Sequence, residues 1–320
     1  MSDYKTVILI EDTGSLSAQE RARALAEKTG FEVFEVNPQK AGHKFSTPQW
    51  QLVFAADGLC LRFTGEPSWS DIRVDFESAA LRYRKQHGGG RNEAIAKAIG
   101  IKGKSTLIVA DCTAGMGTDS FVMASVGAQV TMLERSPQIA ALLDDALFRF
   151  NALNTINTIN TINTINTINT INTINTINTI NTINTINTIN TINTINTTQT
   201  TKGSLNLIEE DASDYLSRAD NAFDVIYLDP MFPHKKKSAA VKKEMQAFQL
   251  LLGADTDSER LLSRAISYCQ TQQASSNETQ QKRIVVKRPS TAPQLSNQQG
   301  LRPNSEIRSK KHRFDVYIFD

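Results

Sequence analysis

The sequence predicts an α/β protein whose larger part is a doubly wound, mainly parallel sheet. From about residue 105 onward, short apolar runs alternate with segments of helical composition, which is the order expected of βαβ units. The run over 225–228 is apolar or aromatic throughout, so both faces of this strand are expected to be covered. Ligands bind such sheets at the carboxyl ends of the strands, and the residues that follow each strand are therefore the candidates for a functional site.

Residues 1–76 predict a small, separate α+β domain, and residues 77–320 form the second predicted domain. No catalytic motif occurs in the first domain, which is expected to position a substrate or to cap the larger domain. Its expected elements are a strand over Thr6–Ile10, a helix over Ser17–Lys28, a strand over Phe31–Val36, and a hairpin within Gln51–Arg62 that turns at Asp57-Gly58.

The larger domain is expected to begin with helices over 77–86 and 92–99, followed by a strand over Thr106–Ala110. This strand runs into a loop that contains Gly115 and Gly117, and a helix is expected from Phe121. The glycines let a ligand lie against the backbone, and the start of the helix offers free N–H groups.

The residues around this glycine loop indicate which ligand it binds. A dinucleotide loop carries a third glycine, but Ser120 occupies that position. The carboxylates of Asp111 and Asp119 flank the loop and would repel a pyrophosphate. They suit the ammonium and sulfonium groups of S-adenosylmethionine, which is the expected cofactor.

The next strand is expected over Gln129–Leu133 and ends at Glu134-Arg135. Glu134 lies about 20 residues beyond the glycine loop, where a nucleotide-binding βαβ unit places its ribose-binding acid. A helix is expected to start at Ser136-Pro137, since serine is a good N-cap and proline a good first helical residue.

An uninterrupted Asn-Thr-Ile repeat follows this helix and ends near residue 200. A period of three matches neither a strand nor a helix, and the repeat has too little variety to specify a packed core. We expect residues 154–200 to be a low-complexity insertion. It connects a helix to the next strand, so it is expected to emerge at the sheet edge away from the ligand.

The remaining elements continue the alternation. Asp211 and Ala212 come shortly after the strand expected over 205–208. An acid at that position could bind an adenine amino group. Strands are expected over 205–208, 225–228, 283–287 and 313–319, helices over 238–252 and 259–269, polar loops over 271–282 and 290–304, and a final antiparallel hairpin that pairs the last strand with residues around Ile307.

The segment D-P-M-F-P carries the chemistry. Asp229 follows the apolar strand 225–228, while Pro230 and Pro233 stiffen the turn around Phe232. A carboxylate beside an aromatic ring suits a planar base with an amino group, because the ring can stack on the base while the acid accepts an N–H. A common Asp-Pro turn with a core phenylalanine is the alternative.

Composition indicates the partner and the compartment. The net charge is only +2, but basic residues cluster near the predicted cleft, which favours a polyanion. The three cysteines form no C-x-x-C pair or metal-like group, and no apolar run is long enough for a membrane helix, so we expect a cytoplasmic protein without structural disulfides. The basic clusters lie at 82–85, 234–237, 242–243, 287–288 and 310–313.

Several segments together resemble a known family. D-P-M-F is similar to the (D/N)-P-P-(Y/F) motif of methyltransferases that act on exocyclic amino groups, and the doubly wound sheet resembles the Rossmann-like fold of class I S-adenosylmethionine-dependent methyltransferases. From about residue 73 to the C-terminus, apart from the repeat, the chain resembles the RsmJ family of 16S ribosomal RNA guanine-N2 methyltransferases. The segments that carry this resemblance are 88–103, 111–122, 132–135, 227–245, 285–289 and 311–317.

The resemblance implies direct methyl transfer to the N2 amino group of a guanine in 16S rRNA or the small ribosomal subunit, with no metal. It implies cofactor contacts at Thr118 with Asp119, at Glu134 with Arg135, at Asp211 with Ala212, and at Asp229. A methyltransferase of another amino group, such as adenine N6, and a non-catalytic rRNA-binding assembly factor are the alternatives. A nicotinamide dehydrogenase is disfavoured by the missing third glycine.

Overall fold

The structure is a computed structural model of the 320-residue chain. It describes residues 4–11, 15–35, 49–87, 90–102, 106–153, 203–218, 223–231, 243–253, 257–275 and 281–320. The predicted insertion over 154–200 and the predicted stacking residue Phe232 lie outside these ranges, as do the basic clusters at 234–237 and at Lys242.

The N-terminal residues form a four-stranded sheet with the strand order β2-β1-β3-β4. β1 is buried along its length and pairs in parallel with both β2 and β3, while β3 and β4 form the predicted antiparallel hairpin. Gly58 adopts a φ of 113° in the turn of this hairpin, which favours glycine. The elements are β1 (Thr6–Ile10), α1 (Leu16–Thr29), β2 (Glu32–Glu35), β3 (Trp50–Ala55) and β4 (Gly58–Phe63).

The larger sheet has seven strands in the order β10-β11-β9-β8-β5-β6-β7. Within this sheet, adjacent strands from β9 to β7 pair in parallel, whereas β11 pairs antiparallel with β9 and β10. The predicted doubly wound sheet with a closing hairpin is therefore confirmed. The strands are β5 (Leu107–Asp111), β6 (Ala128–Glu134), β7 (Ser204–Glu209), β8 (Val225–Leu228), β9 (Lys282–Pro289), β10 (Ser305–Arg308) and β11 (His312–Phe319).

Helices cover both faces of this sheet. Alternate residues of β8 enter two different hydrophobic cores: Val225 and Tyr227 pack with α3, α4 and α8, whereas Ile226 and Leu228 pack with α7 and α9. The helices are α2 (Ala79–His87), η1 (Gly90–Asn92), α3 (Ala94–Ile99), α4 (Thr118–Ser125), a helix over 137–153, α7 (Ala212–Arg218), α8 (Lys243–Leu252) and α9 (Ser258–Ser275).

Three local predictions need correction. α4 begins at Thr118 rather than Phe121, directly after Gly117, which takes an αL conformation at the N-cap. α7 was not predicted. α9 continues to Ser275, where a polar loop from Thr271 was predicted, because glutamine and alanine favour helices even in a polar segment.

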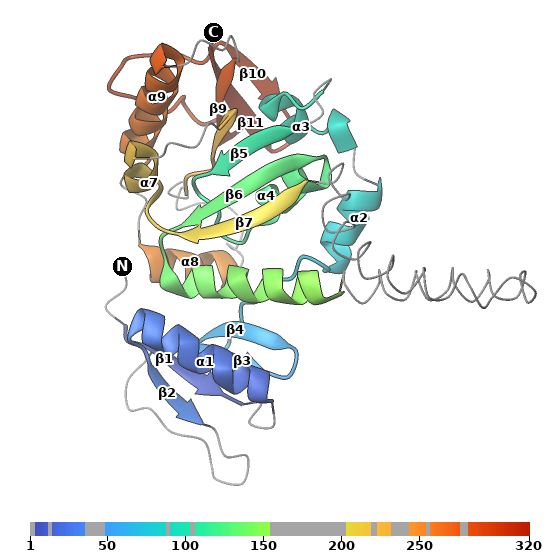
Figure 1. The fold of residues 1–320 in the computed structure, drawn as a ribbon, viewed down its shortest axis with the longest axis vertical. Coiled ribbons are helices and arrows are strands. Elements are labelled where there is room, and N and C mark those ends of the chain that lie inside the picture. The colour runs from blue at the N-terminus through green and yellow to red at the C-terminus, as the bar shows by residue number, and fades with distance from the viewer. Residues whose placement is uncertain are drawn as a thin grey trace, which may run out of the picture.

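One hydrophobic core joins the two sheets. The helix over 137–153 lies between them, with the four-stranded sheet below it and the seven-stranded sheet above it in Figure 1. Phe76 lies in this shared core and stacks on Phe121 with a centroid distance of 5.4 Å. The predicted domain boundary at residue 76 therefore falls within packed structure, and the division into two domains stays a prediction.

Within the described ranges, no helix is both long enough and apolar enough to cross a membrane. Over the same residues, the acidic, histidine and cysteine side chains form no group of three or more that could hold a metal ion.

Candidate cofactor and catalytic site

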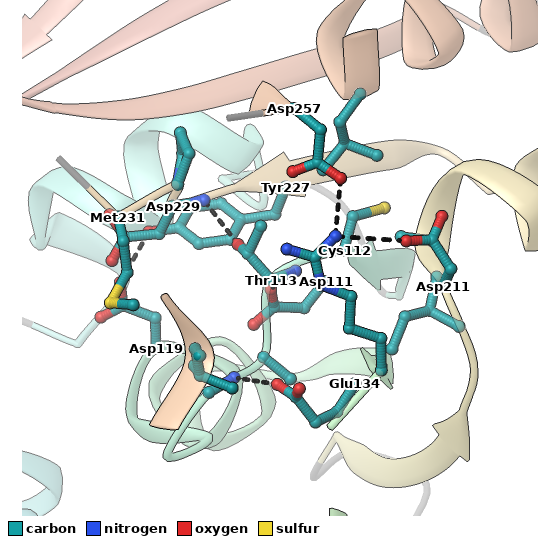
Figure 2. A pocket seen from close by; sticks show the side chains of 18 of the residues that line it. Asp111, Cys112, Thr113, Asp119, Glu134, Asp211, Tyr227, Asp229, Met231 and Asp257 are labelled. Atoms are coloured by element: carbon teal, nitrogen blue, oxygen red, sulfur yellow. Dashed lines mark hydrogen bonds and ion pairs between the residues drawn. The ribbon is translucent and has the colours of Figure 1, made fainter. Parts of the chain in front are cut away.

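A cavity of about 390 Å³ opens at the carboxyl ends of β5, β6 and β8 (Figure 2). Its size is in the usual range for a small-molecule site. Most of the predicted site residues line it, although they come from segments up to 119 positions apart, from Asp111 to Pro230. The predicted residues in its wall are Asp111, Gly115, Thr118, Asp119, Glu134, Arg135, Asp211, Ala212, Asp229 and Pro230.

Glu134 holds the glycine loop against the end of β6. Its Oε2 accepts a hydrogen bond from the Gly115 backbone N–H at 3.1 Å, and its Oε1 accepts one from the Ser136 N–H at 2.8 Å. Burial raises the pKa of Glu134, while these two N–H groups oppose the shift. Because each carboxylate oxygen has two lone pairs, Glu134 can still accept hydrogen bonds from ligand hydroxyls, as predicted for a ribose.

The two loop glycines have different surroundings. Gly115 lines the cavity with a φ of 52°, and a Cβ there would meet only the Thr113 carbonyl oxygen at 3.9 Å. Gly117 does not line the cavity, and a Cβ there would meet Leu143 at 2.9 Å and Phe76 at 3.1 Å. Gly117 therefore lies outside the cavity wall, and a ligand contact at this residue stays a prediction. Its small size serves the packing of α4 onto the shared core.

Asp111 is buried at the end of β5. Its Oδ2 accepts a hydrogen bond from the Ser120 hydroxyl at 2.5 Å, and its Oδ1 accepts one from the Thr113 N–H at 3.1 Å. Burial raises the pKa of Asp111 to about 7, although both hydrogen bonds oppose the shift. A positively charged ligand in the cavity would favour the ionised form of this acid.

We expect Asp111→Asn to stabilise the cofactor-free protein at pH 8. The pKa of Asp111 is about 7 in the folded state, against an ordinary value of 3.8, so the unfolded chain loses this proton first as the pH rises. As the pH rises from about 4 to about 7, the contribution of Asp111 to the free energy of unfolding therefore falls, by an amount on the order of a few kcal/mol. Asparagine does not titrate and can donate to Ser120 while accepting from Thr113.

Urea unfolding of both proteins at pH 5 and pH 8 measures this effect. The variant should lose part of the decline in stability that the parent shows between these pH values, and it should bind S-adenosylmethionine more weakly. An identical pH dependence in the two proteins would contradict the assignment of this titration to Asp111.

Asp229 and Asp119 share one ammonium group, that of Lys287. The Lys287 Nζ lies 2.7 Å from Asp229 Oδ2 and 2.7 Å from Asp119 Oδ2. Two further hydrogen bonds hold the acids: the Tyr227 hydroxyl donates to Asp119 at 2.6 Å, and the Asp229 N–H donates to the Thr113 hydroxyl at 2.6 Å. Figure 2 shows Asp119, Asp229 and Tyr227 on the same side of the cavity.

The three charged groups in this cluster shift one another's pKa values. Burial raises the pKa of Asp229; Lys287 opposes the shift and Asp119 adds to it. Burial also acts to raise the pKa of Asp119, but Lys287 and the Tyr227 hydroxyl hold it below its ordinary value. Burial acts to lower the pKa of Lys287, which the two carboxylates nevertheless raise. Lys287 therefore remains a cation between two acids.

Lys287 and Tyr227 were not among the predicted site residues. Lys287 follows Val286, which pairs with Leu228, so Lys287 lies on β9 directly beside Asp229, the residue that follows the end of β8. The sequence carried one signal, namely the basic pair that ends an apolar strand-like run at 283–287. Only the strand order β9-β8 makes that pair a neighbour of Asp229.

Asp211 has a structural role in addition to its place in the cavity wall. Its Oδ1 accepts hydrogen bonds from the N–H groups of Ser213 at 2.9 Å and Asp214 at 3.3 Å, which caps the start of α7. Its Oδ2 lies 3.5 Å from Arg135 Nη1, which is itself 2.6 Å from Asp257 Oδ2. Arg135 thereby connects the ends of β6, β7 and α9 around the cavity.

The charge of the wall favours a cationic ligand. Among the described residues that line the cavity, seven carry carboxylates and two carry cations. This set would repel a pyrophosphate and suits the sulfonium and ammonium groups of S-adenosylmethionine, with Glu134 available for its ribose. The acids are Asp111, Asp119, Glu134, Glu210, Asp211, Asp229 and Asp257, and the cations are Arg135 and Lys287.

The chain is similar to methyltransferases of known families. A family model described as "Putative SAM-dependent methyltransferase" matches residues 40–190 and 187–319. A solved structure of a SAM-dependent methyltransferase from Neisseria gonorrhoeae is similar with a TM-score of 0.57 and 27% sequence identity, over 97% of this chain and 95% of that chain.

Curated relatives are more similar in sequence and carry a more specific name. Three of them are called ribosomal RNA small subunit methyltransferase J. The protein of Shewanella amazonensis is 37% identical over 84% of this chain and 87% of its own length. That of Pseudoalteromonas atlantica is 39% identical over 82% of both chains. That of Aeromonas salmonicida is 37% identical over 85% of this chain and 87% of its own.

Proposed function

Because the chain belongs to the ribosomal RNA small subunit methyltransferase J family, whose cofactor is S-adenosylmethionine, we propose that it methylates the exocyclic N2 amino group of a guanine in 16S rRNA. One observation of this structure carries the proposal beyond family membership. A carboxylate, Asp229, stands in the wall of a cavity suited to a cationic cofactor, and its side chain is still about a third exposed (35%). An amino group can therefore reach the acid from outside.

The chemistry of the target explains why an acid is needed there. The lone pair of an exocyclic amine is delocalised into the base, which makes the nitrogen a poor nucleophile. Asp229 Oδ2 accepts from Lys287, which leaves Oδ1 to accept an N–H of the target amine. That hydrogen bond favours a pyramidal nitrogen whose lone pair points into the cavity, so orientation and electrostatics supply most of the rate enhancement. The backbone carbonyl of Pro230 is proposed to accept the second N–H.

S-adenosylmethionine, when bound, supplies an electrophilic methyl group on a sulfonium. The nitrogen that takes up this methyl group must then lose one proton. Asp229 stands next to that proton, and because burial raises its pKa it is a better proton acceptor than an exposed aspartate. Lys287 and the Thr113 hydroxyl act as positioning groups, since they hold the carboxylate and the backbone of the same residue.

Guanine N2 is paired in a duplex, so the target base must be unpaired or swung out of the helix to reach Asp229. Phe232 is proposed to stack on the face of this base. It follows Met231, the last described residue of the segment, which lines the cavity.

We expect the purified protein to transfer tritiated methyl groups from S-adenosylmethionine to small ribosomal subunits or 16S rRNA that lack the modification. Digestion to nucleosides should place the label in N2-methylguanosine. Label in N6-methyladenosine would favour a different amino target. Calorimetry that detects no S-adenosylmethionine binding, together with no labelled RNA, would favour a non-catalytic assembly factor.

A further inference from the structure

The basic residues that cluster in the sequence fall into two groups in the structure. Several are already paired: the half-buried Lys287 between two acids, the buried Arg288 with the Pro293 carbonyl oxygen, and the buried Arg313 with Asp315 at 2.6 Å. Lys310 and Lys311 differ, because both are exposed and, in the part of the chain that the structure describes, neither side-chain ammonium has a hydrogen-bond or ion-pair partner; only the Lys311 backbone carbonyl is engaged, by the Ser290 N–H at 3.2 Å. These two cations are available for an external anion.

Lys310 and Lys311 lie in the turn between β10 and β11. β11 runs antiparallel to β9, with His312 opposite Pro289 and Phe314 opposite Lys287. The turn therefore projects beyond the carboxyl end of β9, at the same edge of the sheet where the cavity opens. The Ser309 N–H and hydroxyl both donate to the His312 carbonyl oxygen, at 2.8 and 2.9 Å, so the turn is held closed.

Electrostatic coupling also places this turn beside the cavity. The pKa of His312, which is only partly covered, lies below its ordinary value because of that partial burial and the nearby Lys287 ammonium, with Asp119 opposing the shift. The charges of Lys311 and Arg84 lower it further. His312 is thus within electrostatic reach of the acid–lysine cluster on one side and of the exposed Lys311 on the other.

We propose that the β10–β11 turn, through Lys310 and Lys311, binds phosphates of the RNA strand next to the target nucleotide. This inference rests on the proposed function, since it concerns the same substrate. The cavity accepts a base amino group at Asp229, so a nucleotide that enters it must leave its flanking backbone at the rim. Cations at that rim add affinity that depends on salt and not on sequence.

The double variant Lys310→Ala/Lys311→Ala tests the proposal. The association constant K for a 16S rRNA transcript is measured at several KCl concentrations. In a plot of log K against log[KCl], the slope of the variant should be less negative than that of the parent by about 2, because about two phosphate contacts are lost. Affinity for the RNA at about 0.1 M salt should drop by at least about 10-fold. In the methyl-transfer assay KM for RNA should rise while kcat changes little, and the Kd for S-adenosylmethionine should stay the same.

Arg23→Ala/Arg264→Ala is the matched control. It removes the same charge from exposed positions on α1 and α9, and in the described structure neither arginine has a partner. It should leave the salt slope unchanged. Lys310→Arg/Lys311→Arg should restore the slope, because the phosphate contact needs only a cation.

An unchanged salt slope in the alanine variant would overturn the proposal, as would equal losses in the alanine variant and in the control. The proposal would also be overturned if the alanine variant bound RNA as the parent does but no longer bound phosphatidylserine vesicles. That result would assign the turn to a membrane surface. Failure of the proposed function would look different. RNA binding by the parent protein would then still weaken with salt, and more steeply than in the Lys310→Ala/Lys311→Ala variant. The methyl-transfer assay, however, would place no tritium in guanosine.

Discussion

Asp229→Ala is expected to lower kcat for methyl transfer by about 10³-fold. The carboxylate is the group that accepts the amine N–H and later its proton, and the loss of a single aligned polar group or acid–base group of this kind costs about 10²- to 10⁴-fold. Alanine would also leave Lys287 paired only with Asp119, at 2.7 Å. S-adenosylmethionine should bind more weakly but measurably, because six acids would remain in the wall of the cavity.

Single-turnover methyl transfer with saturating cofactor, together with calorimetry of cofactor binding, separates the two effects. Asp144→Ala is the control, since Asp144 is exposed on the helix over 137–153 and does not line the cavity. Lys287→Met keeps the Asp229 carboxylate but removes the ammonium that positions it and that lowers its pKa. The acidic limb of the pH–rate profile should therefore move to higher pH. Near-normal turnover in Asp229→Ala would exclude the proposed role of this residue.

Asp145→Ala is expected to lower the free energy of unfolding by about 3–5 kcal/mol, the cost typical of removing one partner from a buried ion pair. Asp145 is fully buried and accepts three hydrogen bonds. Arg21 Nη1 on α1 and Arg149 Nε on the same helix lie 2.7 Å from its oxygens, and the Leu59 N–H of β4 donates at 3.0 Å. The variant would remove the carboxylate partner of Arg21 and leave Arg149 with only the more distant carboxylate of Asp75, at 3.8 Å.

This cluster attaches α1 and β4 to the helix over 137–153, because Arg21 lies on α1, Leu59 on β4 and Asp145 on that helix. Urea unfolding followed by circular dichroism measures the loss. Asp144→Ala, one position earlier on the same helix but exposed, should change stability by less than about 0.5 kcal/mol. Equal unfolding midpoints for the two variants would show that the buried cluster contributes little to stability.

Much of the architecture follows from local patterns in the sequence. The apolar run at 225–228 and the chain reversal at Asp57-Gly58 predicted β8 and the β3–β4 hairpin, since strand formation and tight turns depend on neighbouring residues. The positions of Asp111, Glu134 and Asp229 at strand ends followed in the same way. Parallel strands bring their carboxyl ends to one edge, so these acids were expected to meet.

The tertiary structure decided which side chains act on one another. Lys287 lies 58 positions from Asp229 in the sequence, and only the order and register of β8 and β9 place its ammonium between Asp229 and Asp119. Likewise, Gly117 lies in a ligand-type loop but faces Leu143 and Phe76 of the shared core. Periodicity and spacing specify where elements begin and where their polar ends lie. Ion pairs between distant segments depend on strand order and packing, which no local pattern encodes.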